Sequence, residues 1–101
     1  MRRMRRVKIL ATLGPASNDP AMIARLHEAG ADVFRINMSH TSKDDLAERV
    51  AAIRGVEQRA GRPIGILVDL QGPKLRIGTF AKDAEMLLAG ERFVLDADPK
   101  P

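Results

Sequence analysis

VFRINMSHTSKDD, residues 33–45, contains the parts of one strand–loop–helix unit. The apolar and β-branched residues of Val33–Asn37 predict a short β-strand. Thr41 and Ser42 are each followed three positions later by an aspartate, and these two overlapping capping patterns predict the start of a helix. Apolar residues at helical spacing continue to about Ala60, where we expect the helix to end.

The same alternation of strand and helix extends to both sides of this unit. Val7–Thr12 is a short apolar segment typical of a buried strand, and the almost wholly apolar Ile64–Asp69 predicts a third strand. Between Val7–Thr12 and the central strand, Asp19 and Pro20 predict a helix start and Gly30 predicts its end. Strands and helices that alternate about every 30 residues predict repeated βαβ units and a parallel sheet.

The pattern changes near residue 74, after Gly72 and Pro73. Apolar and polar residues then alternate over short stretches, which predicts antiparallel strands with one buried face. The expected strands lie around Ile77 and Phe80, and at Ala84–Leu88 and Arg92–Asp96, with a turn at Ala89-Gly90-Glu91.

Length and charge exclude several classes of protein. The chain has 101 residues and a net charge of +4, and five of its seventeen Lys and Arg residues lie within the first eight positions. The remainder is nearly neutral, so we expect no nucleic-acid partner. The sequence lacks cysteine, and its longest uncharged run, Ile9–Asn18, is too short and too polar to span a membrane. These features are typical of a protein of a reducing compartment.

The predicted elements leave sheet edges and one sheet face without a covering element. A parallel sheet needs both faces covered, and exposed edge strands favour aggregation. We therefore expect the chain to be the N-terminal piece of a longer protein.

Polar residues gather where the predicted parallel strands end, at Thr12–Gly14, Asn37–His40 and Asp69–Arg76. Ligands of parallel α/β folds bind at such carboxyl ends. Within the central strand, alternation places Arg35 on the face opposite the apolar Phe34. A guanidinium inside a sheet needs an anion, and two partners remain open: a salt bridge to Asp69, or a ligand.

The other polar residues at these ends also have two interpretations each. Asn37, Ser39 and Asp69 offer oxygens that suit a hard cation, although residues of these types also form ordinary turns and caps. Lys74 and Arg76 suit phosphate groups, or they lie on a solvated loop. His40 has no second histidine nearby and is expected on a surface loop. A Ser39–His40–Asp69 catalytic triad is rejected, because the geometry has no support.

Three segments, read together, resemble a known family. KILATLGPAS (residues 8–17), VFRINMSHTS (33–42) and ILVDLQGPKLRIG (66–78) are similar, in order and separation, to signature stretches of pyruvate kinase. The resemblance implies an α/β fold: the first three strands and two helices of a (β/α)8 TIM barrel, followed by the start of an inserted antiparallel β-barrel lid. Residues 1–73 would belong to the barrel and 74–101 to the lid.

The resemblance also implies a cytoplasmic glycolytic enzyme that transfers the phosphoryl group of phosphoenolpyruvate to ADP, giving pyruvate and ATP. Full-length family members are expected to be homotetramers. The catalytic lysine and the Mg²⁺ ligands would lie beyond this chain, so we expect the 101 residues alone to be inactive. The alternative is a non-catalytic truncated protein that associates with full-length subunits.

The family pattern assigns roles to individual positions. Arg35 would bind substrate phosphate, while Asn37, Met38, Ser39, His40 and Arg76 would contact the nucleotide. Asn37, Ser39, Asp69 and the Leu70 carbonyl would form a monovalent-cation site. Leu70, Gln71, Lys74 and Ile77 resemble the potassium-independent branch, in which the Lys74 ammonium replaces the potassium charge. K⁺ is therefore not expected to be required, and the cation site can be unoccupied.

Overall fold

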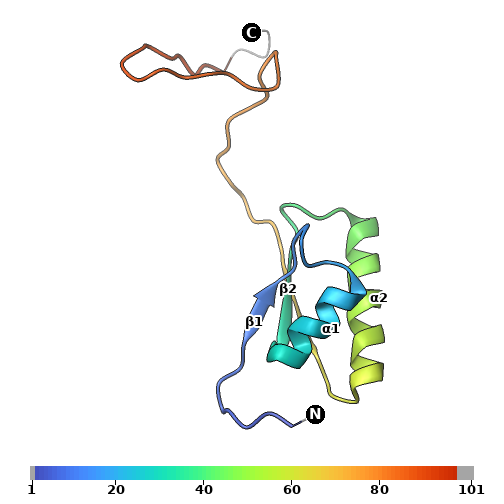
Figure 1. Ribbon diagram of the computed structural model, residues 1–101. Helices are drawn as coiled ribbons and strands as arrows, with labels where there is room; N and C mark the ends of the chain where they lie inside the picture. Colours follow the sequence, from blue (N-terminus) through green and yellow to red (C-terminus); the bar gives the residue numbers. More distant parts are fainter. Residues whose placement is uncertain (1, 98–101) are drawn as a thin grey trace.

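A computed structural model describes residues 2–97 and forms an α/β unit followed by an extended segment (Figure 1). The elements are β1 (Leu10–Thr12), α1 (Pro20–Ala29), β2 (Val33–Asn37), α2 (Lys43–Ala60) and β3 (Gly65–Asp69). All strand pairs are parallel, and the order across the sheet is β1-β2-β3. The predicted alternation of strands and helices is confirmed. Among the described residues, no helix is long and apolar enough to cross a membrane.

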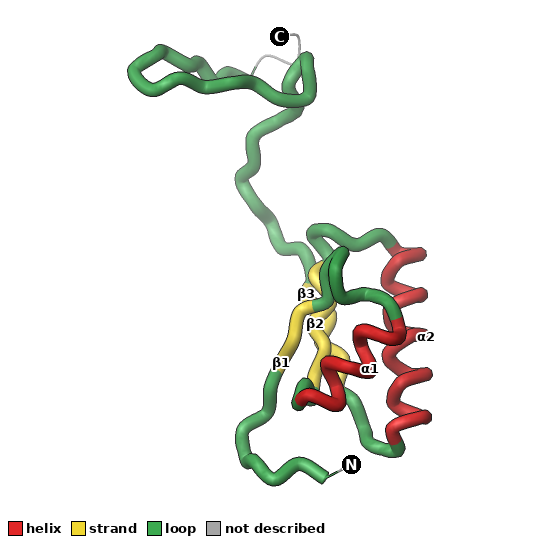
Figure 2. The backbone as a smooth tube through the Cα atoms, in the orientation of Figure 1, coloured by secondary structure: helices red, strands yellow, loops and turns green. Residues whose placement is uncertain are grey.

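Both helices lie on one side of the sheet (Figure 2). In the β1–β2–β3 register, Ala11, Phe34 and Ile66 are direct partners, and they belong to the face that the helices cover. Thr12, Arg35 and Leu67 are partners on the opposite face. The predicted alternation within β2 is therefore correct, and it leaves a guanidinium on the uncovered face.

The core forms between the covered face and the two helices. Phe34 of β2, Ile23 of α1 and Ile53 of α2 are completely buried. Burying one such side chain stabilises a fold by roughly 1.5–3 kcal/mol. The buried apolar residues of the described chain are Leu13, Ile23, Ala31, Phe34, Ile36, Ile53, Val56 and Ile64.

Side-chain caps fix where the helices begin. The Asp19 carboxylate accepts a hydrogen bond from the Met22 N–H at 2.9 Å, and Pro20 follows as the first helical residue. Of the two capping patterns that precede α2, Ser42 provides the cap, because its hydroxyl accepts from the Asp45 N–H at 3.1 Å. Thr41 instead donates its hydroxyl to the Asn37 carbonyl at 2.8 Å, which holds the loop between β2 and α2.

The first strand is shorter than predicted. Val7, Lys8 and Ile9 lie before the strand, and both Val7 and Leu10 are exposed. The expectation of a buried strand over Val7–Thr12 is therefore wrong in extent and in burial. The reason is the register: β2 begins at Val33, opposite Leu10, so earlier residues have no strand to pair with.

No helix or strand forms in the described segment 70–97, so the antiparallel strands predicted there are wrong for this structure. The predicted turn is present: the Glu91 N–H donates to the Leu88 carbonyl at 3.2 Å, and Gly90 adopts a positive φ of 86°. The two arms meet at Phe80 and Phe93, whose rings pack edge to face with centroids 6.3 Å apart. Two strands alone are marginally stable, so an isolated hairpin sequence need not form a ladder.

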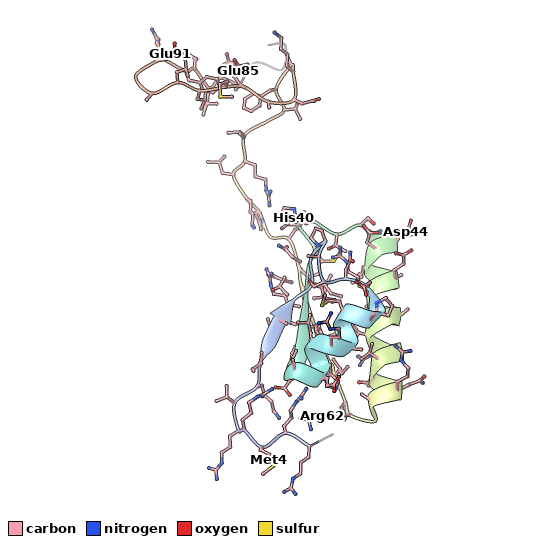
Figure 3. The ribbon with its side chains drawn as sticks, viewed as in Figure 1. Met4, His40, Asp44, Arg62, Glu85 and Glu91 are labelled. Atoms are coloured by element: carbon pink, nitrogen blue, oxygen red, sulfur yellow. The ribbon has the colours of Figure 1, made fainter. Side chains whose placement is uncertain are left out.

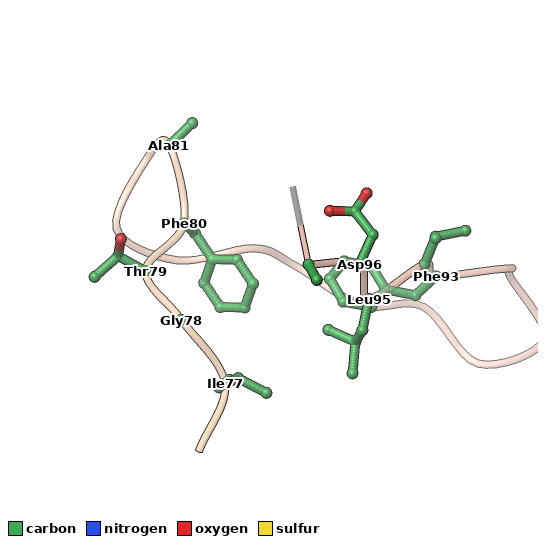
Figure 4. Close-up of a pocket in the computed structure, with 10 residues that line it drawn as sticks. Ile77, Gly78, Thr79, Phe80, Ala81, Phe93, Leu95 and Asp96 are labelled. Carbon is green, nitrogen blue, oxygen red and sulfur yellow. The ribbon is translucent and has the colours of Figure 1, made fainter. Parts of the chain in front are cut away.

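The arms of this segment enclose an open pocket of about 610 Å³ (Figure 4). It is lined by residues 77–81 and 93–97. This pocket is lined mainly by apolar side chains that the rest of the described chain does not cover.

Candidate functional site

The candidate site lies at the carboxyl ends of the strands. Figure 3 shows His40 at this end of the α/β unit and Arg62 at its opposite end. Arg35 and Asn37 project from β2 on the uncovered face, and Asn37 is the direct register partner of Asp69 on β3. The fold thus brings together groups that are more than 30 residues apart in the sequence.

The expected salt bridge between Arg35 and Asp69 is present. The Arg35 Nε donates to Asp69 Oδ2 at 3.0 Å, the Arg35 Nη2 donates to the same oxygen, and Nη1 lies 3.4 Å from the Thr12 hydroxyl. The two charged side chains are 28% and 46% exposed, respectively. A pair this open contributes little to stability, about 0–1 kcal/mol. The guanidinium keeps access to solvent. The salt bridge therefore positions Arg35 and leaves it able to bind a ligand.

The loop after β2 is held by its own hydrogen bonds. The Asn37 side-chain oxygen accepts from the Ser39 N–H at 3.0 Å, and the His40 N–H donates to the Asn37 carbonyl at 3.2 Å. The turn interpretation of Asn37 is therefore correct. An amide oxygen has a second lone pair, so this bond leaves Asn37 able to accept from, or coordinate, a further group.

Two hydrogen bonds connect this loop to the end of β3. The Met38 N–H donates to the Asp69 carbonyl at 3.1 Å, and Gln71 donates its side-chain amide to the Met38 carbonyl at 2.6 Å. The backbone at Met38 is therefore fixed relative to Asp69. The oxygens expected to hold a monovalent cation, from Asn37, Ser39, Asp69 and Leu70, come from these two adjacent strand ends.

The side chains of the remaining predicted residues lie outside this network. Lys74 and Arg76 are exposed on the extended segment that follows β3, and His40 is exposed on its loop, as expected for a surface residue. Residues 2–97 contain no group of three or more His, Asp or Glu side chains placed to hold a metal ion.

Sequence reasoning missed a charged cluster at the opposite end of the sheet, around Asp32. This carboxylate is buried, immediately before β2, and it accepts from the Ile9 N–H at 2.8 Å and from Arg5 Nη1 at 2.7 Å. Arg3 Nε also donates to it, at 3.2 Å. The Ile9 N–H above all, and then Arg5, lower the pKa of Asp32 well below its usual range. The sequence offered a sign of this cluster, because Asp32 immediately precedes a predicted strand and the chain begins with several arginines.

Comparison with known proteins agrees with this architecture. The family described as "Pyruvate kinase, barrel domain" matches residues 4–100. A pyruvate kinase of Methylorubrum extorquens is 64% identical over 101 residues, which are all of this chain and 21% of that protein. A pyruvate kinase of Agrobacterium vitis is 48% identical across 98% of this chain and 21% of its own length. Pyruvate kinase II of Salmonella typhimurium is 43% identical across 96% of this chain and 20% of its own length.

The chain thus spans about a fifth of the length of these relatives. Its parallel strands, its polar strand ends and its match over residues 4–100 lead to one assignment: the chain belongs to the pyruvate kinase family, a family of phosphotransferases of glycolysis.

Proposed function

We propose that this chain is the N-terminal portion of a cytoplasmic enzyme that transfers the phosphoryl group of phosphoenolpyruvate to ADP, giving pyruvate and ATP. Three parallel strands with helices on one side supply the start of a (β/α)8 barrel, in which the uncovered face of the sheet becomes the interior. Residues 1–73 belong to that barrel. Residues 74–101 begin an inserted lid that the rest of the protein completes.

The position of Arg35 is the observation that carries this proposal. Its guanidinium lies on the uncovered face, near the carboxyl ends of the strands, and the Asp69 salt bridge holds it in a fixed orientation. Phosphoryl transfer depends mostly on positioning and on neutralising oxygen charge, and a guanidinium fork matches phosphate oxygens. Arg35 would therefore bind the phosphate of phosphoenolpyruvate.

The loop after β2 supplies the neighbouring contacts. Asn37, Met38, Ser39 and His40, together with Arg76, would contact the nucleotide. A positive charge would lie against the oxygens of Asn37, Ser39, Asp69 and the Leu70 carbonyl. In this chain the Lys74 ammonium would supply that charge, so the enzyme would not require K⁺. Mg²⁺ neutralises phosphate charge in such reactions, and its ligands would come from the remainder of the protein.

The test uses residues 1–101 joined to the remaining four-fifths of the Methylorubrum extorquens relative. In this chimera, Arg35→Ala should lower kcat/KM for phosphoenolpyruvate by about 10²-fold or more, because a preorganised cation in a closed site contributes roughly 3 kcal/mol. Arg35→Lys should recover only part of the loss, because a point charge does not reproduce the fork.

Two controls complete the design. Arg54→Ala, which removes an exposed arginine of α2, should leave kcat/KM within about twofold, because surface substitutions of this kind have small effects. The 101-residue chain alone should show no activity. If Arg35→Ala lowered the melting temperature but left phosphoenolpyruvate kinetics unchanged, Arg35 would be only a structural partner of Asp69.

A further inference from the structure

The amino-terminal end of the sheet holds more positive charge than its own carboxylate balances. Three guanidiniums converge on Asp32: Arg3 Nε at 3.2 Å, Arg5 Nη1 at 2.7 Å and Arg62 Nη2 at 3.6 Å. The exposed fractions are 6% for Asp32, 9% for Arg3, 31% for Arg5 and 23% for Arg62. These four side chains therefore carry a net charge of about +2 around a buried carboxylate, and a further anion would balance that excess.

Two of the three arginines have enough acceptors. Besides Asp32, Arg3 donates to the carbonyls of His27, Glu28 and Ala31, and Arg5 donates to those of Val7 and Gly30. Most of these carbonyls belong to the end of α1, where the helix dipole is negative. Arg3 and Arg5 thus fix the N-terminal arm, which is the segment before β1, to the end of α1.

Arg62 is different, because one of its donors, Nε, is buried without an acceptor among the described residues. Its Nη2 lies beyond hydrogen-bonding distance of Asp32, at 3.6 Å. The oxygens of Asp32 already accept from Ile9, Arg3 and Arg5. A buried N–H without an acceptor is rare in folded proteins, and a bound water or ion is an ordinary explanation for one.

We propose that Arg62, beside the cluster of Arg3, Asp32 and Arg5, binds a small oxyanion of the phosphate class. An arginine side chain presents Nε and Nη donors in one plane, which suits two oxygens of such an anion. The anion would accept from Arg62 and balance the excess charge of the cluster. Since Arg62 and His40 lie at opposite ends of the α/β unit (Figure 3), this site is separate from the candidate site for phosphoenolpyruvate.

The experiment measures binding of inorganic phosphate to the chimera by equilibrium dialysis. Every variant of the chimera in this experiment also carries Arg35→Ala, and phosphoenolpyruvate is absent. Phosphate bound in the substrate site then contributes least to the measured binding. Arg62→Gln should raise the dissociation constant for phosphate by at least about tenfold, because it removes a charge-assisted pair of hydrogen bonds. Arg62→Lys should restore only part of the affinity. Sulfate should compete with phosphate, and chloride should not.

The matched control is Arg59→Gln, which removes an exposed arginine from the last turn of α2 and should leave the dissociation constant unchanged. Folding is checked by introducing Arg62→Gln into the otherwise unaltered chimera, whose turnover of phosphoenolpyruvate should persist. The proposal is overturned if phosphate does not bind saturably, or if Arg62→Gln and Arg59→Gln bind it equally well.

Discussion

At the scale of single residues, the two ends of the sheet use arginine and aspartate differently. Arg35 and Asp69 form an open pair, in which the carboxylate orients a guanidinium that still faces solvent. Asp32 is buried and accepts from several donors, so it orders the N-terminal arm. The Arg35 guanidinium is thus left accessible to a ligand, whereas the Asp32 carboxylate is occupied by donors of the chain itself.

Lys74 is expected to determine the potassium dependence of the chimera. The protein with Lys74 should work without added potassium, because a tethered ammonium has a high effective concentration near the oxygens of the cation site. Lys74→Glu should be inactive without potassium and should recover partly when it is added. The measurement is steady-state activity in tetramethylammonium buffer, with and without potassium chloride.

Lys82→Glu is the control for this change, because it alters the charge of another exposed lysine in the same segment. It should keep the potassium-independent activity. A chimera that is inactive without potassium while Lys74 is intact would contradict the proposed role of the ammonium.

Asp32 should make stability depend on pH in the acid range. Its pKa in the folded chain lies below its ordinary value of 3.8, so the ionised form stabilises the fold. The contribution is complete above about pH 5 and is lost as the pH falls through the ordinary value towards the folded one. The urea midpoint of the 101-residue chain at low concentration, followed by circular dichroism, should fall over this range. Asp32→Asn should flatten that fall, whereas Asp44→Asn, at an exposed position of α2, should not.

At the scale of elements, glycine contributes differently at two positions. Gly30 ends α1 with a φ of 136°, and an added Cβ would lie 3.1 Å from the Arg5 Nη2. Gly55 lies inside α2, where an added Cβ would meet only the Arg59 Nη1, at 3.4 Å. The first glycine is required by backbone conformation, while the second only lowers the helix propensity of α2.

Gly30→Ala should therefore destabilise the chain by about 1–2 kcal/mol, because residues with a side chain rarely adopt this conformation. Gly55→Ala should stabilise it by roughly 0.5–1 kcal/mol. Urea denaturation of the two variants beside the unaltered chain measures both effects. Equal effects of the two alanines would contradict this distinction.

At the scale of the whole molecule, the chain is more open than its length requires. Its radius of gyration is 19.5 Å, compared with about 13 Å for a compact domain of 100 residues. The extended segment after β3 accounts for the difference (Figure 1). Leu10 and Leu67 are exposed on the uncovered face of the sheet, and no described strand pairs with the outer edge of β1 or of β3.

We therefore expect the 101-residue chain, prepared alone, to self-associate. Exposed strand edges and apolar patches favour pairing between copies. Sedimentation velocity should show a mass that rises with concentration, and Leu67→Lys should shift the distribution towards monomer. A concentration-independent monomer with a sharp cooperative melt would show that the described elements are sufficient by themselves.

Local sequence determined the secondary structure of residues 10–69. The boundaries of α1, β2 and α2 were predictable because caps, glycines and apolar periodicity act over a few residues. The polar strand ends were also predictable, since parallel strands place their carboxyl ends along one edge. The sequence could name Asp69 as a candidate partner of Arg35, but it could not decide between this salt bridge and a ligand.

Tertiary structure decided what depends on distant partners. Register with β2 set where β1 begins, and packing between Asp32, Arg3, Arg5 and Arg62 formed a cluster that no local pattern contains. The segment 70–97 has the alternating pattern of strands but forms none. A β-ladder needs a second backbone at the right distance and an element that covers its apolar face. Sequence thus determined the elements that caps and apolar patterns mark within a few residues, and the tertiary structure decided what depends on contacts between residues far apart in the chain.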